Sequence, residues 1–143
     1  MKISTAESCT GGLLGSKITD ISGSSQVYEG GVIAYTNPQK IIQLGVKQNT
    51  LERFTDVSRE VALEMAYGVR ERFNTDIGVS TTGFLDLEEG HPLVYCAIAS
   101  EFGNDCFLLN SDYLVKIPQR DILKDRVCKV LIDRAYRHAL NMY

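Results

Sequence analysis

The 143 residues, 44% of them hydrophobic and 23% charged, fit one globular domain with its own core and exclude a disordered or fibrous chain. The formal net charge of -3 and the pI near 5.4 argue against nucleic acid or an anionic membrane surface as a partner, because clustered Lys and Arg hold such partners. No apolar run approaches the ~20 residues that span a bilayer, and the first residues do not form a secretion signal, so we expect a cytoplasmic protein.

Strands and helices alternate along the first half of the chain. The pattern predicts a short apolar strand, a helix closed by the turn-forming ISGSS, and a strand with a glycine pair in its middle, at residues 2–6, 11–20 and 27–35. The glycine pair predicts a bulge or a close backbone approach. Two short helices are predicted at residues 38–44 and 48–53. Ser58 is a natural N-cap for a longer helix, whose apolar residues recur at the spacing of a core-facing stripe: Val61, Ala62, Met65, Ala66, Val69 and Phe73.

The second half continues the alternation. A buried strand is predicted at residues 77–83, and two apolar runs at 93–102 and 107–117 are close enough to form a hairpin. A final helix at about 119–141 is predicted to turn six residues inward: Ile122, Leu123, Val127, Val130, Leu131 and Ala135. Because no repeat or linker divides the chain, we predict a single layered α/β/α domain with a mixed central sheet.

The cysteines and histidines do not form a recognisable site. The four cysteines lack CxxC spacing, which argues against a zinc site; they are Cys9, Cys96, Cys106 and Cys128. Cys96 and Cys128 lie in apolar runs, so we predict that both are small buried thiols. Cys9 stays open because it lies inside the stretch AESCTGG. The two histidines, His91 and His138, are far apart in sequence, so a hydrolytic serine here needs another base.

Polar clusters follow three of the predicted strands: AESCTGG, AYTNPQK and STTG. In open α/β sheets, ligands bind beyond the carboxyl ends of the strands, where helix N-termini present free backbone N–H groups. The same residue types also build ordinary turns and helix caps. Each cluster is therefore ambiguous by itself, and their common placement favours a functional site.

The stretch AESCTGGLLGSKITDISGSSQVYEGGVIAYTNPQKIIQLGV resembles the opening of the CinA C-terminal domain family, the nicotinamide mononucleotide amidohydrolases. The similarity continues in DVSREVALEMAYGVRERFNTDIGVSTTG and reaches the last helix more faintly. Three features carry it: the run SCTGG, the AYTN with a lysine three residues on, and the VS before a helix.

This resemblance implies hydrolysis of nicotinamide mononucleotide to nicotinate mononucleotide and ammonia, with no metal and no cofactor. It assigns the nucleophile to Ser8, with Tyr35 and Lys40 as the other catalytic residues. The chemistry agrees, because a desolvated lysine can be neutral enough to take the serine proton, and a tyrosine can position or relay it. The structural alternatives are that Ser8 or Thr10 caps the helix, that the Tyr35 ring lies in the core, and that Lys40 is solvated.

Binding residues are expected around this trio. Backbone N–H groups near the glycine pair of AESCTGG could stabilise an oxyanion, and the clusters AYTNPQK and STTG could contact the substrate. The resemblance also implies an arginine at the start of the last helix that binds the phosphate or the pyridine amide. The resulting candidates are Thr10, Gly11, Gly12, Asn37, Thr82, Gly83 and Arg120, with Thr81 beside Thr82 and Lys124 one turn after Arg120. Thr81 and Thr82 could equally be loop residues, and Arg120 could be a solvated helix start.

Two departures from the family pattern leave a second function open. Residues 83–93, GFLDLEEGHPL, replace a Gly-Ile-Ala-Gly-Pro stretch and a glycine-rich loop, and Asp86, Glu88 and Glu89 would repel an anion. The domain, residues 1–143, is also expected to lack the helix that precedes the first strand in the family. We therefore weigh an active amidase against a catalytically silent binding or assembly subunit. The resemblance implies a small pyridine nucleotide as ligand and a homo-oligomer.

Overall fold

A five-stranded mixed sheet forms the middle layer of the computed structural model, which describes residues 1–86, 92–110, 114 and 119–142. The strands are β1 (Ile3–Glu7), β2 (Tyr28–Ile33), β3 (Ile77–Phe84), β4 (Leu93–Ser100) and β5 (Gly103–Leu109), in the order β2-β1-β3-β4-β5. β1 pairs in parallel with β2 and β3, whereas β3–β4 and β4–β5 are antiparallel. The predicted mixed sheet is confirmed.

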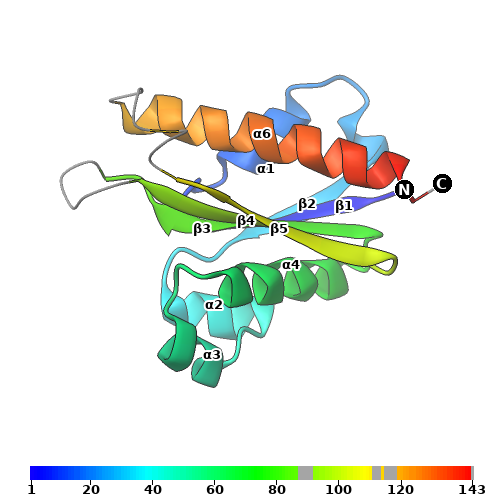
Figure 1. Ribbon diagram of the computed structural model, residues 1–143. Helices are drawn as coiled ribbons and strands as arrows, with labels where there is room; N and C mark the ends of the chain where they lie inside the picture. The colour runs from blue at the N-terminus through cyan, green and yellow to red at the C-terminus, as the bar shows by residue number, and fades with distance from the viewer. Residues whose placement is uncertain (87–91, 111–113, 115–118, 143) are drawn as a thin grey trace.

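Helices cover both faces of this sheet (Figure 1). One face carries α1 (Leu13–Thr19) and the long α6 (Arg120–Leu140), with the short 3-10 helix η1 (Ser24–Gln26) after α1; the other carries α2 (Asn37–Leu44), α3 (Gln48–Phe54) and α4 (Arg59–Phe73). The layered α/β/α architecture is therefore confirmed. None of the helices in the described ranges is long and apolar enough to span a bilayer.

The two faces of the sheet bury different kinds of side chain. Large aliphatic residues such as Leu123 and Leu131 fill the space under α6. Under α4, Ala62 and Ala66 meet Ala97 and Ala99, so the helix lies close to the strands. A Cβ at Gly78 would lie 2.1 Å from the Ala66 carbonyl oxygen, which shows how close that approach is.

Two local predictions are confirmed. Ser58 caps α4, because its Oγ accepts a hydrogen bond of 3.2 Å from the Val61 N–H. The glycine pair of β2 lies at an irregularity of pairing, where the register with β1 shifts between Tyr28 and Gly30. A Cβ at Gly31 would lie 2.7 Å from the Thr5 carbonyl oxygen, so the backbones also approach closely.

The second strand of the hairpin begins earlier in the chain than predicted. β5 spans Gly103–Leu109 rather than 107–117, and Leu114 is helical; residues 111–113 and 115–118 lie outside the described residues. A tight turn at Glu101 and Phe102 places Gly103 at φ 142°, a conformation that favours glycine. The prediction was wrong because β5 is an edge strand, whose polar first half looks like a loop in the sequence.

The inward placement of Ile122 is also wrong. Its side chain is 44% exposed, whereas its neighbour Leu123 is fully buried. Adjacent residues of a helix point about 100° apart. Because Leu123 faces the sheet, Ile122 is turned to the flank that also carries exposed Arg126.

Candidate functional site

Ser8 lies where the carboxyl ends of three parallel strands meet. It follows β1 directly, and its backbone N–H donates to the Thr81 carbonyl oxygen of β3 at 3.0 Å. Its Oγ donates a long hydrogen bond of 3.4 Å to the carbonyl oxygen of Tyr35, two residues after β2. The structure therefore brings Ser8, Tyr35 and the end of β3 together, with Ser8 only 5% exposed.

A buried carboxylate shapes the turn that follows Ser8. Glu7 is the last residue of β1, and its side chain accepts four hydrogen bonds: from Thr10 Oγ1 (2.7 Å) and the N–H groups of Gly12 (3.2 Å), Leu14 (2.7 Å) and Gly15 (3.0 Å). The negative charge thus satisfies the N-terminus of α1. The alternative that Ser8 or Thr10 caps this helix is wrong, because the N-cap is Gly12, at φ 103° and without a side-chain cap. Glu7 was missed by the sequence reasoning, although an acidic residue just before a helix start was visible as a signal.

The backbone N–H groups of the glycine pair are already engaged. Gly11 donates to the Ser8 carbonyl oxygen at 3.1 Å, and Gly12 donates to Glu7. These bonds give the predicted oxyanion role of Gly11 and Gly12 no support. The side chain of Thr10 is fully buried and bonded to Glu7 and Thr81, while a role for its N–H stays a prediction.

Lys40 is a buried lysine, with an exposed fraction of only 2%. It lies on α2, and its Nζ donates to the Asn37 Oδ1 at a long 3.4 Å. Burial lowers the pKa of the Lys40 ammonium below its ordinary value, and the charge of Asp56 only partly opposes this effect. The alternative of a solvated lysine is therefore wrong, and a larger share of Lys40 is neutral than at an exposed site.

Tyr35, Arg120 and Asp86 form an exposed rim. The Tyr35 side chain is 59% exposed, so the alternative of a core ring is wrong. Arg120, at the start of α6, donates to the Asp86 carboxylate at 2.7 Å and to the Tyr35 hydroxyl at 3.4 Å. The bond to Asp86 raises the pKa of Arg120. Arg120, which was predicted to bind an anion of the substrate, is thus already paired with Asp86. Glu88 and Glu89 lie outside the described residues.

The third cluster belongs to β3 rather than to a loop. Thr81 and Thr82 are fully buried; Thr81 Oγ1 is bonded to Thr10 Oγ1 at 2.8 Å, and Thr82 Oγ1 donates to the Asp56 carbonyl oxygen at 2.7 Å. A Cβ at Gly83 would lie 2.3 Å from the Leu93 carbonyl oxygen, so this glycine serves strand pairing. These contacts explain Thr82 and Gly83 structurally, whereas Asn37 is exposed beside Lys40.

The other candidate nucleophiles do not fit the site. Cys96 and Cys128 are buried, as predicted. Burial raises the pKa of the Cys9 thiol to about 12, although Thr81 and the positive charge of Lys40 oppose it, so Cys9 is protonated at neutral pH. His138 lies in the last turn of α6 against Ser100, at 2.9 Å, and His91 is outside the described residues. Within the described ranges, no group of three or more His, Cys, Asp or Glu side chains could hold a metal ion.

Comparison with known sequences identifies the domain type. The model of the family described as CinA C-terminal domain matches residues 1–112. A competence-damage inducible protein of Halothermothrix orenii is 53% identical over 102 residues, which are 68% of this chain and 25% of that relative. A CinA-like protein of Kosmotoga olearia is 51% identical over 64% of this chain and 22% of its own length. The chain thus spans about a quarter of the length of these curated relatives.

Solved structures agree with the fold. The competence/damage inducible protein CihA from Agrobacterium tumefaciens superposes with a TM-score of 0.80 and 36% identity, over 99% of this chain and 86% of that chain. A CinA superfamily protein from Escherichia coli gives a TM-score of 0.72 and 30% identity over 90% and 80%. A Klebsiella pneumoniae protein has a TM-score of 0.85 at 22% identity, covering 94% of this chain and 84% of that chain, and shows similarity of fold alone.

Proposed function

The chain belongs to the CinA C-terminal domain family, and we propose that it hydrolyses the amide of nicotinamide mononucleotide to nicotinate mononucleotide and ammonia. Ser8 is the nucleophile, Lys40 the general base, and Tyr35 positions or relays the proton. The observation that carries the proposal is the burial of the Lys40 side chain, which is only 2% exposed, together with the lowered pKa that this burial causes. A buried lysine that gives up its proton more readily than an exposed one supports amide hydrolysis without a metal.

In the proposed reaction the Ser8 Oγ attacks the amide carbon while neutral Lys40 takes the hydroxyl proton. The tetrahedral anion collapses, the C–N bond breaks, and Lys40 returns its proton to the departing ammonia. This step leaves the nicotinate mononucleotide acyl group as an ester on Ser8. Water, deprotonated by Lys40, then attacks the ester and releases the carboxylate, and Ser8 regains its proton.

Two cationic side chains of α6 favour a phosphate-bearing substrate. Arg120 presents a planar guanidinium at the rim, and the Lys124 Nζ lies 3.5 Å from the point where a Cβ of Gly11 would stand. The exposed backbone of Gly11 therefore has a positive charge beside it. We propose that this side receives the phosphate, which requires Arg120 to exchange Asp86 for the ligand.

A catalytically silent binding or assembly subunit is the second candidate. The observation in its favour is the Arg120–Asp86 pair, because the residue that would recognise the anion already has a carboxylate. A homo-oligomer in the cytoplasm, with no nucleic-acid or membrane partner, is proposed under either function. Since the matched region is only about a quarter of the length of the curated relatives, the activity of any longer protein is likewise a proposal.

Ammonia release from nicotinamide mononucleotide distinguishes the two functions. We expect turnover by the purified protein, loss of turnover in Ser8→Ala, and unchanged turnover in Ser16→Ala, a control at an exposed serine of α1. Circular dichroism checks that both variants fold. Undiminished activity in folded Ser8→Ala would refute the role of Ser8 as nucleophile. Absence of ammonia release from the unsubstituted protein and both variants would favour the catalytically silent subunit.

A further inference from the structure

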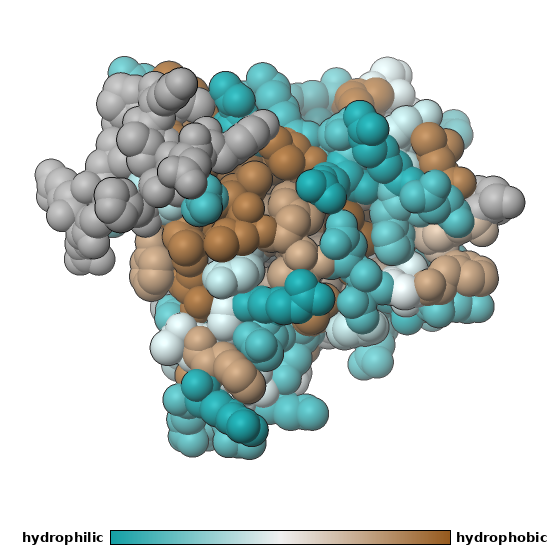
Figure 2. All heavy atoms as spheres, in the orientation of Figure 1, coloured by the Kyte–Doolittle hydropathy of each residue, from teal (hydrophilic) through white to brown (hydrophobic). Residues whose placement is uncertain are grey.

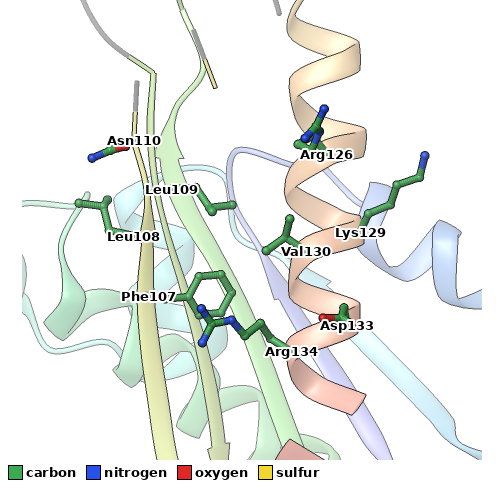
Figure 3. Close-up of a pocket in the computed structure, with 9 residues that line it drawn as sticks. All are labelled: Phe107, Leu108, Leu109, Asn110, Arg126, Lys129, Val130, Asp133 and Arg134. Carbon is green, nitrogen blue, oxygen red and sulfur yellow. The ribbon is translucent and has the colours of Figure 1, made fainter. Parts of the chain in front are cut away.

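A broad groove between β5 and α6 carries charges that are already paired. Its volume is about 980 Å³, and Figure 2 shows apolar atoms gathered between these two elements, with hydrophilic side chains around them. Lys129 contacts Asp125 at 2.8 Å. Arg134 contacts Asp105 at 3.7 Å and lies over the Phe107 ring (Figure 3). Because these cations have partners, the groove selects no charged ligand.

A carboxylate near Ser8 differs from these groups, because it has no hydrogen bond or ion pair of its own. Asp56 is half-buried between α3 and α4, and within the described ranges no such contact reaches its side chain. Its charge acts on Lys40, whose pKa it raises. The proposed mechanism needs Lys40 without its proton, and in that state the Asp56 charge is left without a balancing cation in the part of the chain that the structure describes.

The segment that carries Asp56 lies on the same side of the sheet as Ser8. Ser80 of β3 faces α4, because its Oγ donates to a carbonyl oxygen of that helix at 2.6 Å. Thr82 faces the same way, and its Oγ1 donates to the Asp56 carbonyl oxygen at 2.7 Å. On β1, Ala6 packs into the cluster under α4, and Ser8 follows two residues later. Both segments therefore lie on the face covered by α2, α3 and α4, where β1 and β3 end (Figure 1).

An exposed aromatic ring ends the same row of β3 side chains. Phe84 follows Thr82 by two residues, so its side chain projects from the same face about 7 Å further along the strand. This residue is 50% exposed. The face of an aromatic ring attracts a cation, as a carboxylate does. Asp56 and Phe84 together therefore favour a cationic group at this end of the sheet.

The backbone before Asp56 is held in a conformation that few residues adopt. Thr55 has φ 69° and ψ 170°, a region that is populated almost only by glycine. Its N–H donates to the Leu51 carbonyl oxygen at 3.0 Å, and its carbonyl oxygen accepts a hydrogen bond of 3.0 Å from the Ser58 Oγ. Such strain persists only where the surrounding structure enforces it, and it is concentrated at functional sites. These bonds fix the backbone that carries Asp56.

We propose that Asp56 and Phe84 recognise the positive charge of the pyridinium ring of the substrate, an inference that rests on the proposed function. Nicotinamide mononucleotide carries a quaternary ring nitrogen and a phosphate, so it bears both charges. The chain has the complementary arrangement, with Asp56 and Phe84 on the side of α4, and Arg120 and Lys124 on α6 across the sheet. A ring that brings its amide to Ser8 thus has its cation beside Asp56 and its phosphate toward α6. The site should therefore select a pyridinium over a neutral ring of the same shape.

Calorimetric titration with nicotinamide mononucleotide and a neutral isostere tests the proposal. In the isostere, carbon replaces the ring nitrogen, so the amide, the ribose and the phosphate are kept and the positive charge is lost. The parent protein is Ser8→Ala, because the proposed reaction cannot proceed in it and binding is measured without turnover. We expect this protein to bind the mononucleotide about tenfold tighter than the isostere.

Two substitutions in the Ser8→Ala protein should reduce this preference. Asp56→Asn should weaken binding of the mononucleotide by about tenfold and leave binding of the isostere unchanged. Phe84→Leu should weaken binding of the mononucleotide by about threefold, again without an effect on the isostere. Asp20→Asn, at the end of α1, and Phe102→Leu, in the turn between β4 and β5, are the matched controls at exposed positions and should change neither affinity.

Several results would overturn this assignment. Equal binding of the two ligands would exclude recognition of the cation, and equal weakening of both by Asp56→Asn would show that this carboxylate contacts the ribose hydroxyls instead. No binding of either ligand to folded Ser8→Ala would refute the site. The ammonia assay separates the two proposals. Ammonia release by the unsubstituted protein without selective binding would refute this inference alone, whereas selective binding without ammonia release would refute the amidase alone.

Discussion

Around Ser8 the side chains are buried, and those of Glu7, Thr10 and Thr81 are bonded to one another, whereas around Arg120 the side chains are exposed and joined by a short chain of contacts. The buried half of the site comprises Glu7, Ser8, Thr10, Lys40 and Thr81. The exposed rim comprises Tyr35, Asp86 and Arg120, with half-buried Lys124 beside them. Buried hydrogen bonds to a charge are each worth about 1.5–3 kcal/mol, and exposed ion pairs about 0–1 kcal/mol. The fold therefore fixes the turn that follows Ser8 through Glu7, while single substitutions can alter recognition at the rim.

The largest effect is expected at Lys40. Lys40→Arg keeps a positive charge but cannot deprotonate near neutral pH, so the rate of ammonia release should fall by about 10²–10⁴-fold, as far as in Lys40→Ala. Steady-state kinetics of both variants check this. Recovery of most of the rate in Lys40→Arg would make Lys40 a fixed cation rather than a base.

Glu7→Gln should destabilise the buried half of the site and leave the exposed rim unchanged. A glutamine at this position loses the charge that four donors share and turns an amide N–H₂ toward some of them. The free energy of unfolding should fall by about 2–3 kcal/mol, measured by urea denaturation. Glu71→Gln, at an exposed position of α4, is the control and should change it by less than about 0.5 kcal/mol. Equal effects of the two substitutions would contradict the role of Glu7.

Asp86→Asn should strengthen binding of the substrate phosphate at the rim and leave the buried half of the site unchanged. Freed from its carboxylate partner, Arg120 should bind the substrate phosphate better, lowering KM for the mononucleotide by up to about fivefold with kcat unchanged. The KM for the phosphate-free nucleoside should stay the same. Asp20→Asn, exposed at the end of α1, is the control. A raised KM in Asp86→Asn would mean that Asp86 positions Arg120 for the ligand.

The smallest effect concerns the pH profile. In the proposed reaction Lys40 is the base, so the rate should rise with pH and level off above the pKa of Lys40, which burial lowers below its ordinary value. The charge of Asp56 raises this pKa, so Asp56→Asn should lower it further. The rising limb of kcat/KM against pH should then move to lower pH by a fraction of a unit. A shift to higher pH would show that another group titrates.

Much of the fold could be predicted because its signals are local. The stripe from Val61 to Phe73 and the cap at Ser58 depend on spacing within one helix, and the glycine pair of β2 marked a real irregularity. β5 was misplaced because an edge strand tolerates polar residues, which weakens the alternation that identifies strands. Ile122 was placed inward because the apolar residues of α6 extend around more of the helix than the face that packs on the sheet.

The site was less predictable because its contacts cross the sequence. The strand pattern placed the clusters that contain Ser8, Tyr35 and Lys40 at the carboxyl ends of strands, and the resemblance assigned their roles. No pattern indicated that the Glu7 carboxylate would accept hydrogen bonds from the N–H groups of the following turn. Thr82 was assigned to a ligand because β3 is buried on both faces and shows no alternation from which its direction could be read. The pair of Arg120 with Asp86 joins residues 34 positions apart, which only the tertiary structure brings together.

Acid-quench mass spectrometry of the first turnover tests most directly whether the buried half performs covalent catalysis. Protein and nicotinamide mononucleotide are mixed, stopped at successive times, digested and analysed for an acyl ester, with ammonia measured in the same samples. We expect the nicotinate mononucleotide acyl group on the peptide that carries Ser8, appearing with the first ammonia and before free nicotinate mononucleotide. Ammonia and free nicotinate mononucleotide appearing together, while the Ser8 peptide stays unmodified at every time point, would contradict the account.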